Sequence, residues 1–450
     1  MSTKILSRRL VVALLVLALV LPILMAAGGR EAAEPGEQRI VFWTGIPGEA
    51  GPDALAEAFN ERMREQGRNV VAVHERFVNN ADGNTRLDTA LLSGEQIDVY
   101  VNYNRDLMVT RIENGLAADL TPFIEANGFD LEAEFGSLAG FSYHEGRPYM
   151  LPAARAIEVV FYNKTEFDRR GITIPDNWTW SDYAEIALEL TDRDAGVFGS
   201  MLFPWGAHLW ERAGRTYFGG NWRYNDEGMS NLGHPVYEEL LNVHYRMDQV
   251  DRSQMPLAEQ MATRSDPHVE FVRGNVMMFG VSNAWVVRTL VDREQFPHDF
   301  VTAIAPSPRV NAAQSDYFDL AGPQDMPVIG PNPGDPELAW EFLQFFSTEG
   351  YVHHIPGGRA PGWLGYDPDM VADLFIGNNA DLLDVDSFAA YYFSGDIEIS
   401  VPDQFTAAAQ LGPIEEEEYR RAVLGEISVS QAVQNAERRS SDAIRQARSR

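Results

Sequence analysis

The sequence predicts an α/β protein of about two or three domains, the first of which contains a parallel sheet. Its 450 residues correspond to that number at roughly 100–200 residues per domain. Short apolar runs alternate with segments of helical spacing from residue 40 to residue 115, and the pattern starts anew after Tyr149. Hydrophobic residues make up 45% of the chain and charged residues 23%, which is typical of folded globular proteins and not of disordered chains.

The first domain shows the order strand, helix, strand, helix, strand. Apolar runs predict the strands at 40–43, 70–73 and 97–101. The first helix is indicated by Leu55 and Phe59, which recur at helical spacing. Strands joined by helices in this way pair in parallel, and the ligands of such sheets bind beyond the carboxyl ends of the strands. The loops that follow the first and third strands are therefore the first candidates for a functional site.

A second domain is expected after Tyr149. An apolar run at 157–162 predicts a strand, and Ser181 is the expected N-cap of the helix that follows. Further along, 300–304 predicts another strand and 335–346 shows helical spacing. Because both kinds of element continue into this part of the chain, the α/β class extends to the second domain.

The charge and the lack of cysteine exclude several functions. The chain holds 66 acidic and 36 basic side chains, and the net charge of −30 disfavours binding to nucleic acid and to anionic membrane surfaces. It has no cysteine, which rules out disulfides, thiolate nucleophiles, Cys-ligated zinc and a lipoprotein anchor. His353 and His354 are adjacent, a poor spacing for one metal ion, so we expect neither a metal site nor a cofactor.

The N-terminus has the pattern of an export signal. A basic segment at 1–9 is followed by an apolar run at 10–27 that ends in small residues. An uncleaved membrane anchor is the alternative, since the run reaches the lower limit of a spanning helix, but Pro22 and the small residues favour a cleaved signal. We therefore predict a signal peptide at 1–29 and a flexible leader at 30–39.

Several segments, taken in order, resemble the extracellular solute-binding proteins of ATP-driven importers, and among them the sugar-binding family that includes the maltose-binding proteins. The segments that carry the resemblance are 40–45, 92–100, 113–122, 159–164 with the Pro-x-x-Trp-x-Trp stretch after it, 271–279 with Trp285, and 337–343. The resemblance covers roughly residues 38 to 435. Each segment alone is a weak signal, whereas their common order behind an export signal is specific.

The resemblance implies a two-lobed periplasmic-binding-protein fold, in which each lobe is a mainly parallel sheet flanked by helices and the ligand binds in a cleft between the lobes. It places the three segments that cross between the lobes near 152–156, 304–308 and 329–333. Lobe one is then expected to contain 38–152 plus 305–330, and lobe two 153–304 plus 331–450.

The residues expected to bind the ligand follow from the chemical groups on the surface of a sugar. Its C–H faces pack on aromatic rings, and its hydroxyl groups bond to planar polar side chains. The candidates are Trp43, Thr44, Asn102, Tyr103, Asn104, Arg105, Arg155, Trp205, Trp285, Gly358 and Arg359. Core packing is the alternative role of Trp43 and Trp285, bracing of a carboxylate that of Arg155, and a plain tight turn that of Gly358 and Arg359.

The predicted function is the periplasmic solute-binding component of an ABC transporter. On this interpretation the protein captures a sugar or oligosaccharide, delivers it to the membrane permease subunits, acts as a monomer and catalyses nothing. A secreted carbohydrate-active enzyme is one alternative, because 66 acidic residues supply pairs of carboxylates by chance. A binder of a polyamine or a metal chelate is another, since Tyr391 and Tyr392 resemble the paired tyrosines of ferric-ion binders.

Overall fold

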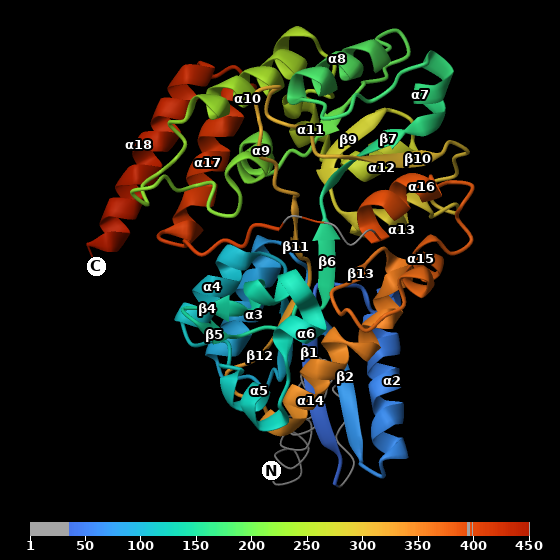
Figure 1. Cartoon of the computed structure of the whole chain (residues 1–450), viewed down its shortest axis with the longest axis vertical. Helices are drawn as coiled ribbons and strands as arrows, with labels where there is room; N and C mark the ends of the chain where they lie inside the picture. Colours follow the sequence, from blue (N-terminus) through green and yellow to red (C-terminus); the bar gives the residue numbers. More distant parts are fainter. Residues whose placement is uncertain (1–35, 394–396, 398, 450) are drawn as a thin grey trace, which may run out of the picture.

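The computed structural model describes residues 36–393, 397 and 399–449. The predicted signal peptide and most of the predicted leader lie outside the described residues. The described chain forms two lobes stacked along the long axis of the molecule, with lobe one at the bottom and lobe two at the top of Figure 1. Each lobe has its own sheet and its own core, so the α/β class and the two-lobed fold are confirmed.

The sheet of lobe one has the strand order β12-β3-β1-β2. Its strands are β1 (Gln38–Thr44), β2 (Val70–Arg76), β3 (Val99–Asn102) and β12 (Met326–Ile329). β1 pairs in parallel with β2 and β3, as the alternation of strands and helices predicts, whereas β12 pairs antiparallel with β3 from a distant part of the chain. Because β1 begins at Gln38, the last two residues of the predicted leader belong to the sheet.

Helices pack around this sheet, one of them from late in the chain. They are η1 (Gly48–Ala50), α2 (Pro52–Glu65), α3 (Ala81–Leu92), α4 (Arg105–Glu113), α5 (Thr121–Asn127), α6 (Leu131–Phe135), η2 (Gly136–Ser142) and α14 (Pro336–Ser347), with a hairpin of β4 (Tyr143–His144) and β5 (Arg147–Pro148). Phe42 of β1 packs against Phe342 of α14, with ring centroids 4.9 Å apart. The assignment of α14 to lobe two is therefore wrong, because its aromatic face completes the core of lobe one.

The sheet of lobe two has the strand order β10-β7-β9-β8. Its strands are β7 (Val159–Asn163), β8 (Met201–Leu202), β9 (Met278–Ser282) and β10 (Thr302–Pro306). β7 pairs antiparallel with both β9 and β10, and β8 pairs in parallel with β9. This sheet is therefore mixed and not mainly parallel, because β9 and β10 run opposite to the strand that enters the lobe from its boundary.

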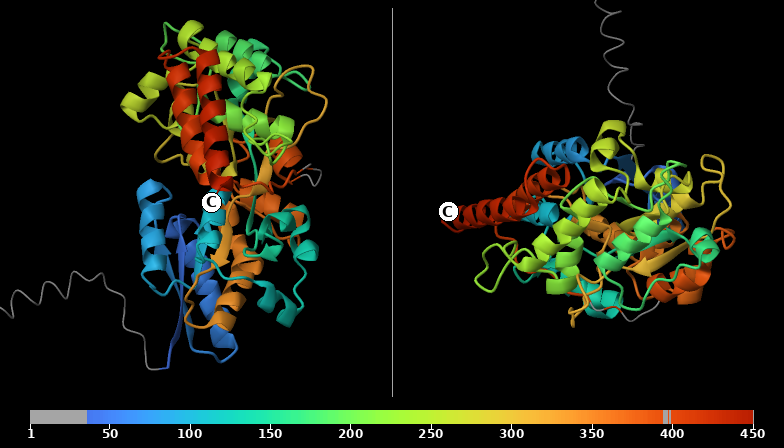
Figure 2. Two further views of the ribbon diagram at one scale, coloured as in Figure 1. Left: turned by 90° about the vertical axis from the view of Figure 1, so that its left-hand side faces the viewer. Right: turned by 90° about the horizontal axis from the view of Figure 1, so that it is seen from above.

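Lobe two carries most of the helices. They are α7 (Lys164–Arg170), α8 (Trp180–Leu190), α9 (His208–Phe218), α10 (Pro235–Tyr245), η3 (Arg246–Val250), α11 (Leu257–Thr263), α12 (Pro267–Val272), η4 (Ala284–Val286), α13 (Val287–Leu290), η5 (Glu349–Gly357), α15 (Pro368–Ile376), α16 (Val385–Phe388), η6 (Ala389–Phe393), α17 (Ala408–Val423) and α18 (Val429–Arg448), with η5 at the border to lobe one. Thr179, and not Ser181, is the N-cap of α8, because its hydroxyl and Asp182 form a reciprocal capping box. Figure 2 shows α17 and α18 side by side, with the end of α18 projecting from the body.

A small sheet of crossing strands joins the lobes. β6 (Ala154–Ile157) runs from lobe one into lobe two (Figure 1) and pairs antiparallel with β11 (Ala321–Pro323) and β13 (Ala360–Pro361). The first crossing thus lies at the predicted place. The second and third lie further along the chain than predicted. Residues 302–306 form β10 inside lobe two, so the second crossing, back into lobe one, comes later, at β11. After β12 the chain stays in lobe one through α14, so the third crossing comes at β13.

Candidate functional site

A cavity of about 560 Å³ lies at the boundary between the lobes. This volume falls within the roughly 300–1,000 Å³ of small-molecule sites. Lobe one contributes the start of α4, lobe two contributes α9 and the loop after it, and the segment 399–405 contributes a third side. Its polar and aromatic lining residues include Tyr103, Asn104, Arg105, Asp106, Phe141, Glu158, Trp205, Glu211, Arg212, Arg215, Trp222, Arg223, Asn283 and Phe405.

The lobe-one wall is the turn from β3 into α4. Asn104 is the N-cap of α4, and its Oδ1 accepts a hydrogen bond from the backbone N–H of Leu107 at 2.9 Å. The hydroxyl of Tyr103 accepts a hydrogen bond from the backbone N–H of Gly45 at 2.8 Å, which ties the loops after β1 and β3 together. The carboxyl ends of the parallel strands therefore place these side chains at the cavity, as the sequence predicts.

The lobe-two wall is a network of two guanidiniums and two carboxylates. Arg212 and Arg215 lie on α9, and their nitrogens are 3.2 Å and 3.1 Å from the carboxylate of Glu158. Arg212 also pairs with Glu211 at 2.8 Å. Burial raises the pKa of Glu211, but the positive charges of Arg212 and Arg215 outweigh it and hold this pKa below its ordinary value. The carboxylate of Glu211 thus stays ionised, and Glu158 and Glu211 together fix the two guanidiniums as hydrogen-bond donors.

An ion pair crosses the cavity from one lobe to the other. Arg223 of lobe two lies 3.0 Å from Asp106 of α4 and 2.9 Å from Glu415 of α17. Burial lowers the pKa of Arg223, but Glu415 and Asp106 more than compensate, so its pKa is raised and it stays charged. Its guanidinium also lies over the ring of Trp222, 4.6 Å from the centroid.

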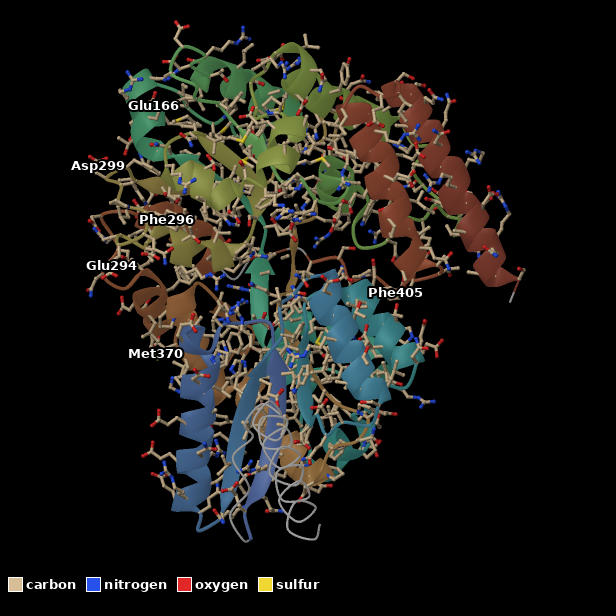
Figure 3. All side chains as sticks on the ribbon, turned by 180° about the vertical axis from the view of Figure 1, so that it is seen from behind. Glu166, Glu294, Phe296, Asp299, Met370 and Phe405 are labelled. Atoms are coloured by element: carbon tan, nitrogen blue, oxygen red, sulfur yellow. The ribbon has the colours of Figure 1, made fainter. Side chains whose placement is uncertain are left out.

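The segment 399–405 is bound to lobe two and rests on lobe one. Asn221 donates to the carboxylate of Asp403 at 2.7 Å and accepts from the backbone N–H groups of Asp403 and Gln404 at 3.0 Å and 3.2 Å. On the other side, Val401 packs against Gly140, and Phe405 lies under the guanidinium of Arg105 at 5.2 Å. Figure 3 shows Phe405 at the level where the lobes meet.

Trp205 is an exposed aromatic ring at the cavity. Half of its surface, 50%, is accessible, while its ring centroid lies 4.7 Å from that of Phe203. An indole held on one side and open on the other can stack on a flat apolar ligand surface. Of the residues selected from the sequence, the structure therefore brings Tyr103, Asn104, Arg105 and Trp205 together at the cavity.

Three predicted residues lie in the core of lobe one instead. Trp43 is 1% exposed and packs in the core, with the guanidinium of Arg86 4.8 Å from its ring centroid. The hydroxyl of Thr44 bonds to Nε2 of His74 at 2.9 Å, and Asn102 accepts from Arg111 at 2.6 Å. Since their partners belong to the same lobe, these side chains hold lobe one together, and none of the three lines the cavity.

The other four predicted residues lie along the lobe boundary. Arg155 of β6 donates to the carbonyl of Tyr392 at 2.5 Å, and Arg359 pairs with the buried Asp325 at 3.0 Å. Gly358, at φ 81°, packs so closely that an added Cβ would lie 2.3 Å from the carbonyl oxygen of Ala284. Trp285 is half-buried and forms an edge-to-face contact with a histidine ring. These residues brace the crossing segments and are not among the residues that line the cavity.

The lobe-two network is not among the residues that the sequence predicts. One signal was available: Glu158 is a charged residue inside the otherwise apolar run at 157–162, and a buried carboxylate needs a partner. Glu211 and Arg215 are spaced i,i+4, which places them on one helix face, but nothing in the sequence says which face meets the cavity.

The described residues bear on three further features: metal-binding groups, paired tyrosines and membrane-spanning helices. Within it, no group of three or more histidine and acidic side chains is arranged to hold a metal ion. Tyr392 is fully buried, and its hydroxyl donates to the carbonyl of Ile157 at 2.9 Å, so it serves packing. Among the described helices, none combines the length and the apolar character needed to cross a bilayer.

Residues 48–352 match the family described as bacterial extracellular solute-binding protein, which is more than half of the chain. The protein therefore belongs to this family of extracellular solute-binding proteins. The match starts after β1 and ends in η5, so it includes both lobes and all but one side of the cavity.

Solved structures with the same fold are distant in sequence. An ABC substrate-binding protein from Listeria monocytogenes in complex with cycloalternan is 18% identical, with a TM-score of 0.74 over 91% of this chain and 99% of that chain. UgpB from Mycobacterium tuberculosis in complex with glycerophosphocholine is 17% identical, with a TM-score of 0.70 over 91% and 99%. The GacH receptor of Streptomyces glaucescens, solved unliganded and with acarbose, is 15% identical, with a TM-score of 0.70 over 91% and 99%. At this level of identity the similarity concerns the fold.

Proposed function

We propose that the protein is the periplasmic solute-binding component of an ABC importer and captures a saccharide or polyol in the interlobe cavity. The observation that carries the proposal is the lining of this cavity, in which both lobes supply guanidinium groups, an amide and aromatic rings. Guanidinium and amide donors suit hydroxyl oxygens, and the open face of Trp205 suits the C–H face of a sugar ring. Cycloalternan and acarbose, bound by two proteins of the same fold, are saccharides, which supports this choice.

The mechanism proposed for capture is closure of the lobes around the solute. A solute that touches both α4 and α9 binds the closed form more tightly than the open form, and this differential affinity shifts the population. The closed, loaded monomer then delivers the solute to the membrane permease subunits. The export of the protein is assigned to the predicted signal peptide, which is followed by no cysteine for a lipid anchor.

We propose no catalytic step at the cavity. A glycosidase needs a carboxylic acid with a raised pKa opposite a second carboxylate. Here Asp106, Glu158 and Glu211 each pair with a guanidinium, and the pKa of Glu211 is lowered. Carboxylates paired in this way orient arginines, and the lowered pKa makes Glu211 a poor proton donor.

A thermal-shift screen tests the proposal. The purified protein is heated with saccharides, polyols, polyamines and metal chelates, and a solute at about 100 times its dissociation constant adds roughly 2.7 kcal/mol to the free energy of unfolding. We expect stabilisation by a saccharide or polyol, without hydrolysis on prolonged incubation. Stabilisation by a polyamine or a metal chelate alone contradicts the proposal, and turnover of the bound saccharide supports the enzyme alternative.

A further inference from the structure

Among the described residues, every arginine that lines the cavity has a carboxylate partner except one. Arg212 and Arg215 share the carboxylates of Glu158 and Glu211, and Arg223 holds two carboxylates of its own. The fourth lining guanidinium, that of Arg105, forms no ion pair with any carboxylate of the described chain. In a protein with 66 acidic and 36 basic side chains, a cavity arginine without an acidic partner is unexpected.

The surroundings of Arg105 fix its guanidinium without neutralising it. Nη1 donates to the carbonyl of Phe141, and Nη2 donates to the carbonyl of Tyr143 at 3.0 Å. The rings of Phe141 and Phe405 lie 5.4 Å and 5.2 Å from the guanidinium carbon. Nε is buried and has no hydrogen-bond partner among the described residues. Burial lowers the pKa of Arg105 to about 10, although the charge of neighbouring Asp106 acts against it. The guanidinium is thus preorganised at the cavity, and its charge is only partly compensated.

Arg76 and Arg288 form a second set of guanidiniums without an acidic ion-pair partner among the described residues, and they lie at the boundary near Trp285. Arg288 of α13 lies over the ring of Trp285, 5.7 Å from its centroid, and is close enough to Arg359 and to Arg76 of lobe one to be repelled by both. Glu49 and Asp266 attract it more weakly, and neither forms an ion pair with it. Arg76 and Arg288 are both exposed, and they come from different lobes. Like charges that face each other across the boundary oppose closure until an anion lies between them.

We infer that the solute of this cavity is an acidic one, a saccharide or polyol whose anionic oxygen group binds the guanidinium of Arg105. This inference rests on the function proposed above and adds the chemical class of the solute. A carboxylate or a phosphate presents two oxygens that match the planar fork of a guanidinium, and the bond is charge-assisted. Arg76 and Arg288 draw the same kind of solute to the boundary, although the net charge of −30 repels it from the rest of the surface.

Isothermal titration calorimetry with a matched pair of ligands tests this inference. The pair is trigalacturonate and galactotriose, which differ only in the oxidation of C6, and glycerophosphocholine serves as the phosphate probe. We expect an acidic probe to bind at least roughly 30-fold more tightly than galactotriose, as is typical when one member of a buried charge pair is absent. Binding of trigalacturonate identifies the anionic group of the solute as a carboxylate, and binding of glycerophosphocholine identifies it as a phosphate.

Two arginine variants complete the experiment. Arg105→Gln should lose about 30-fold in affinity for the acidic probe but only about three- to tenfold for galactotriose, which loses a neutral hydrogen bond instead of a charge-assisted one. Arg64→Gln, which removes an equal charge from the exposed face of α2, should change neither affinity. Preferential binding of galactotriose overturns the inference and leaves the proposed function standing. Binding of none of the three probes contradicts both. Should Arg105→Gln fail to fold, the preference of the unaltered protein between the matched ligands still decides.

Discussion

The guanidinium of Arg223 and the carboxylate of Asp106 lie 3.0 Å apart and join the two lobes directly across the cavity. Their side chains are 17% and 25% exposed, so water screens this ion pair only in part. Arg223 keeps Glu415 as a second partner within lobe two. The bond to Asp106 is therefore the part of this network that exists only while the lobes are together.

Asp106→Asn should favour the open form. Loss of a partly buried ion pair removes about 1–2 kcal/mol from the closed state, so the apparent affinity for the bound saccharide falls by up to about 30-fold. Small-angle X-ray scattering of the unliganded variant should show a larger radius of gyration. Asp168→Asn, which breaks an exposed ion pair with Lys164 within lobe two, is the control and should leave both quantities unchanged. Equal scattering curves for both variants and the parent protein contradict this role.

Trp205→Ala and Trp43→Ala should have opposite effects. Trp205 is half exposed, so its removal should weaken saccharide binding by about 1–3 kcal/mol and hardly change the free energy of unfolding. Trp43 is buried, so its removal should cost roughly 3–5 kcal/mol of stability. Urea titrations and calorimetry on the two variants measure both quantities. A large stability loss for Trp205→Ala with unchanged affinity assigns that ring to the core.

The segment 399–405 should loosen when Asn221 is replaced by Ala. Three hydrogen bonds to Asp403 and Gln404 are lost, at about 1 kcal/mol or less each because the site is exposed. Hydrogen exchange measured by mass spectrometry should speed up in 399–405, and affinity should fall because this segment lines the cavity. Asn225→Ala is the matched control, since its side-chain oxygen accepts from the backbone N–H groups of Glu227 and Met229 and its side-chain nitrogen donates to Ser230, all in the same loop. Unchanged exchange in the first variant shows that other contacts hold the segment.

The protein should lose stability in mild acid through His244. Burial lowers the pKa of His244 to about 3, and Tyr419 and Gln254 bond to its two ring nitrogens at 2.6 Å each. In the unfolded chain this histidine takes up a proton below about pH 6.5, so the unfolded state binds more protons and stability falls as the pH drops. Between pH 7 and pH 5 this group alone accounts for about 2 kcal/mol.

His244→Gln should reduce that pH dependence. The free energy of unfolding from urea titrations at pH 7 and pH 5 should differ by about 2 kcal/mol less in the variant than in the parent protein. The same loss at pH 5 in both proteins means that other groups cause the acid sensitivity. His208, whose pKa burial lowers well below its ordinary value, is the next one to replace.

The sequence predicts the elements of lobe one well, because their signals are local. The runs at 40–43, 70–73 and 97–101 are apolar because both faces of a parallel sheet are covered. The crossing segments are harder to predict. Pro306 follows an apolar run and has the pattern of a hinge, yet β10 pairs with β7 through Pro306, and that pairing joins residues far apart in the chain.

In the candidate site, too, residues with a local signal can be predicted, and residues placed by contacts between distant parts of the chain cannot. Tyr103, Asn104 and Arg105 follow the carboxyl end of a strand. They can be predicted because ligands of parallel sheets bind beyond the carboxyl ends of the strands. Trp43 also ends an apolar run, but the strand continues to Thr44 and its side chain points into the core. Arg212 and Arg215 lie on a helix whose orientation depends on contacts within lobe two, which no local pattern reveals.

The packing of Phe42 against Phe342 also dictates when lobe one can fold. Three of its strands are made early, but β12 and α14 follow only after most of lobe two has been synthesised. Until then the edge of β3 that pairs with β12 has no partner, and the ring of Phe42 lacks its contacts with Phe342 and Phe346. Contacts between residues so distant in sequence form slowly, because a long loop has to close first. A growing chain therefore carries an unfinished first lobe for most of its synthesis, a state that suits threading through a translocation channel before folding.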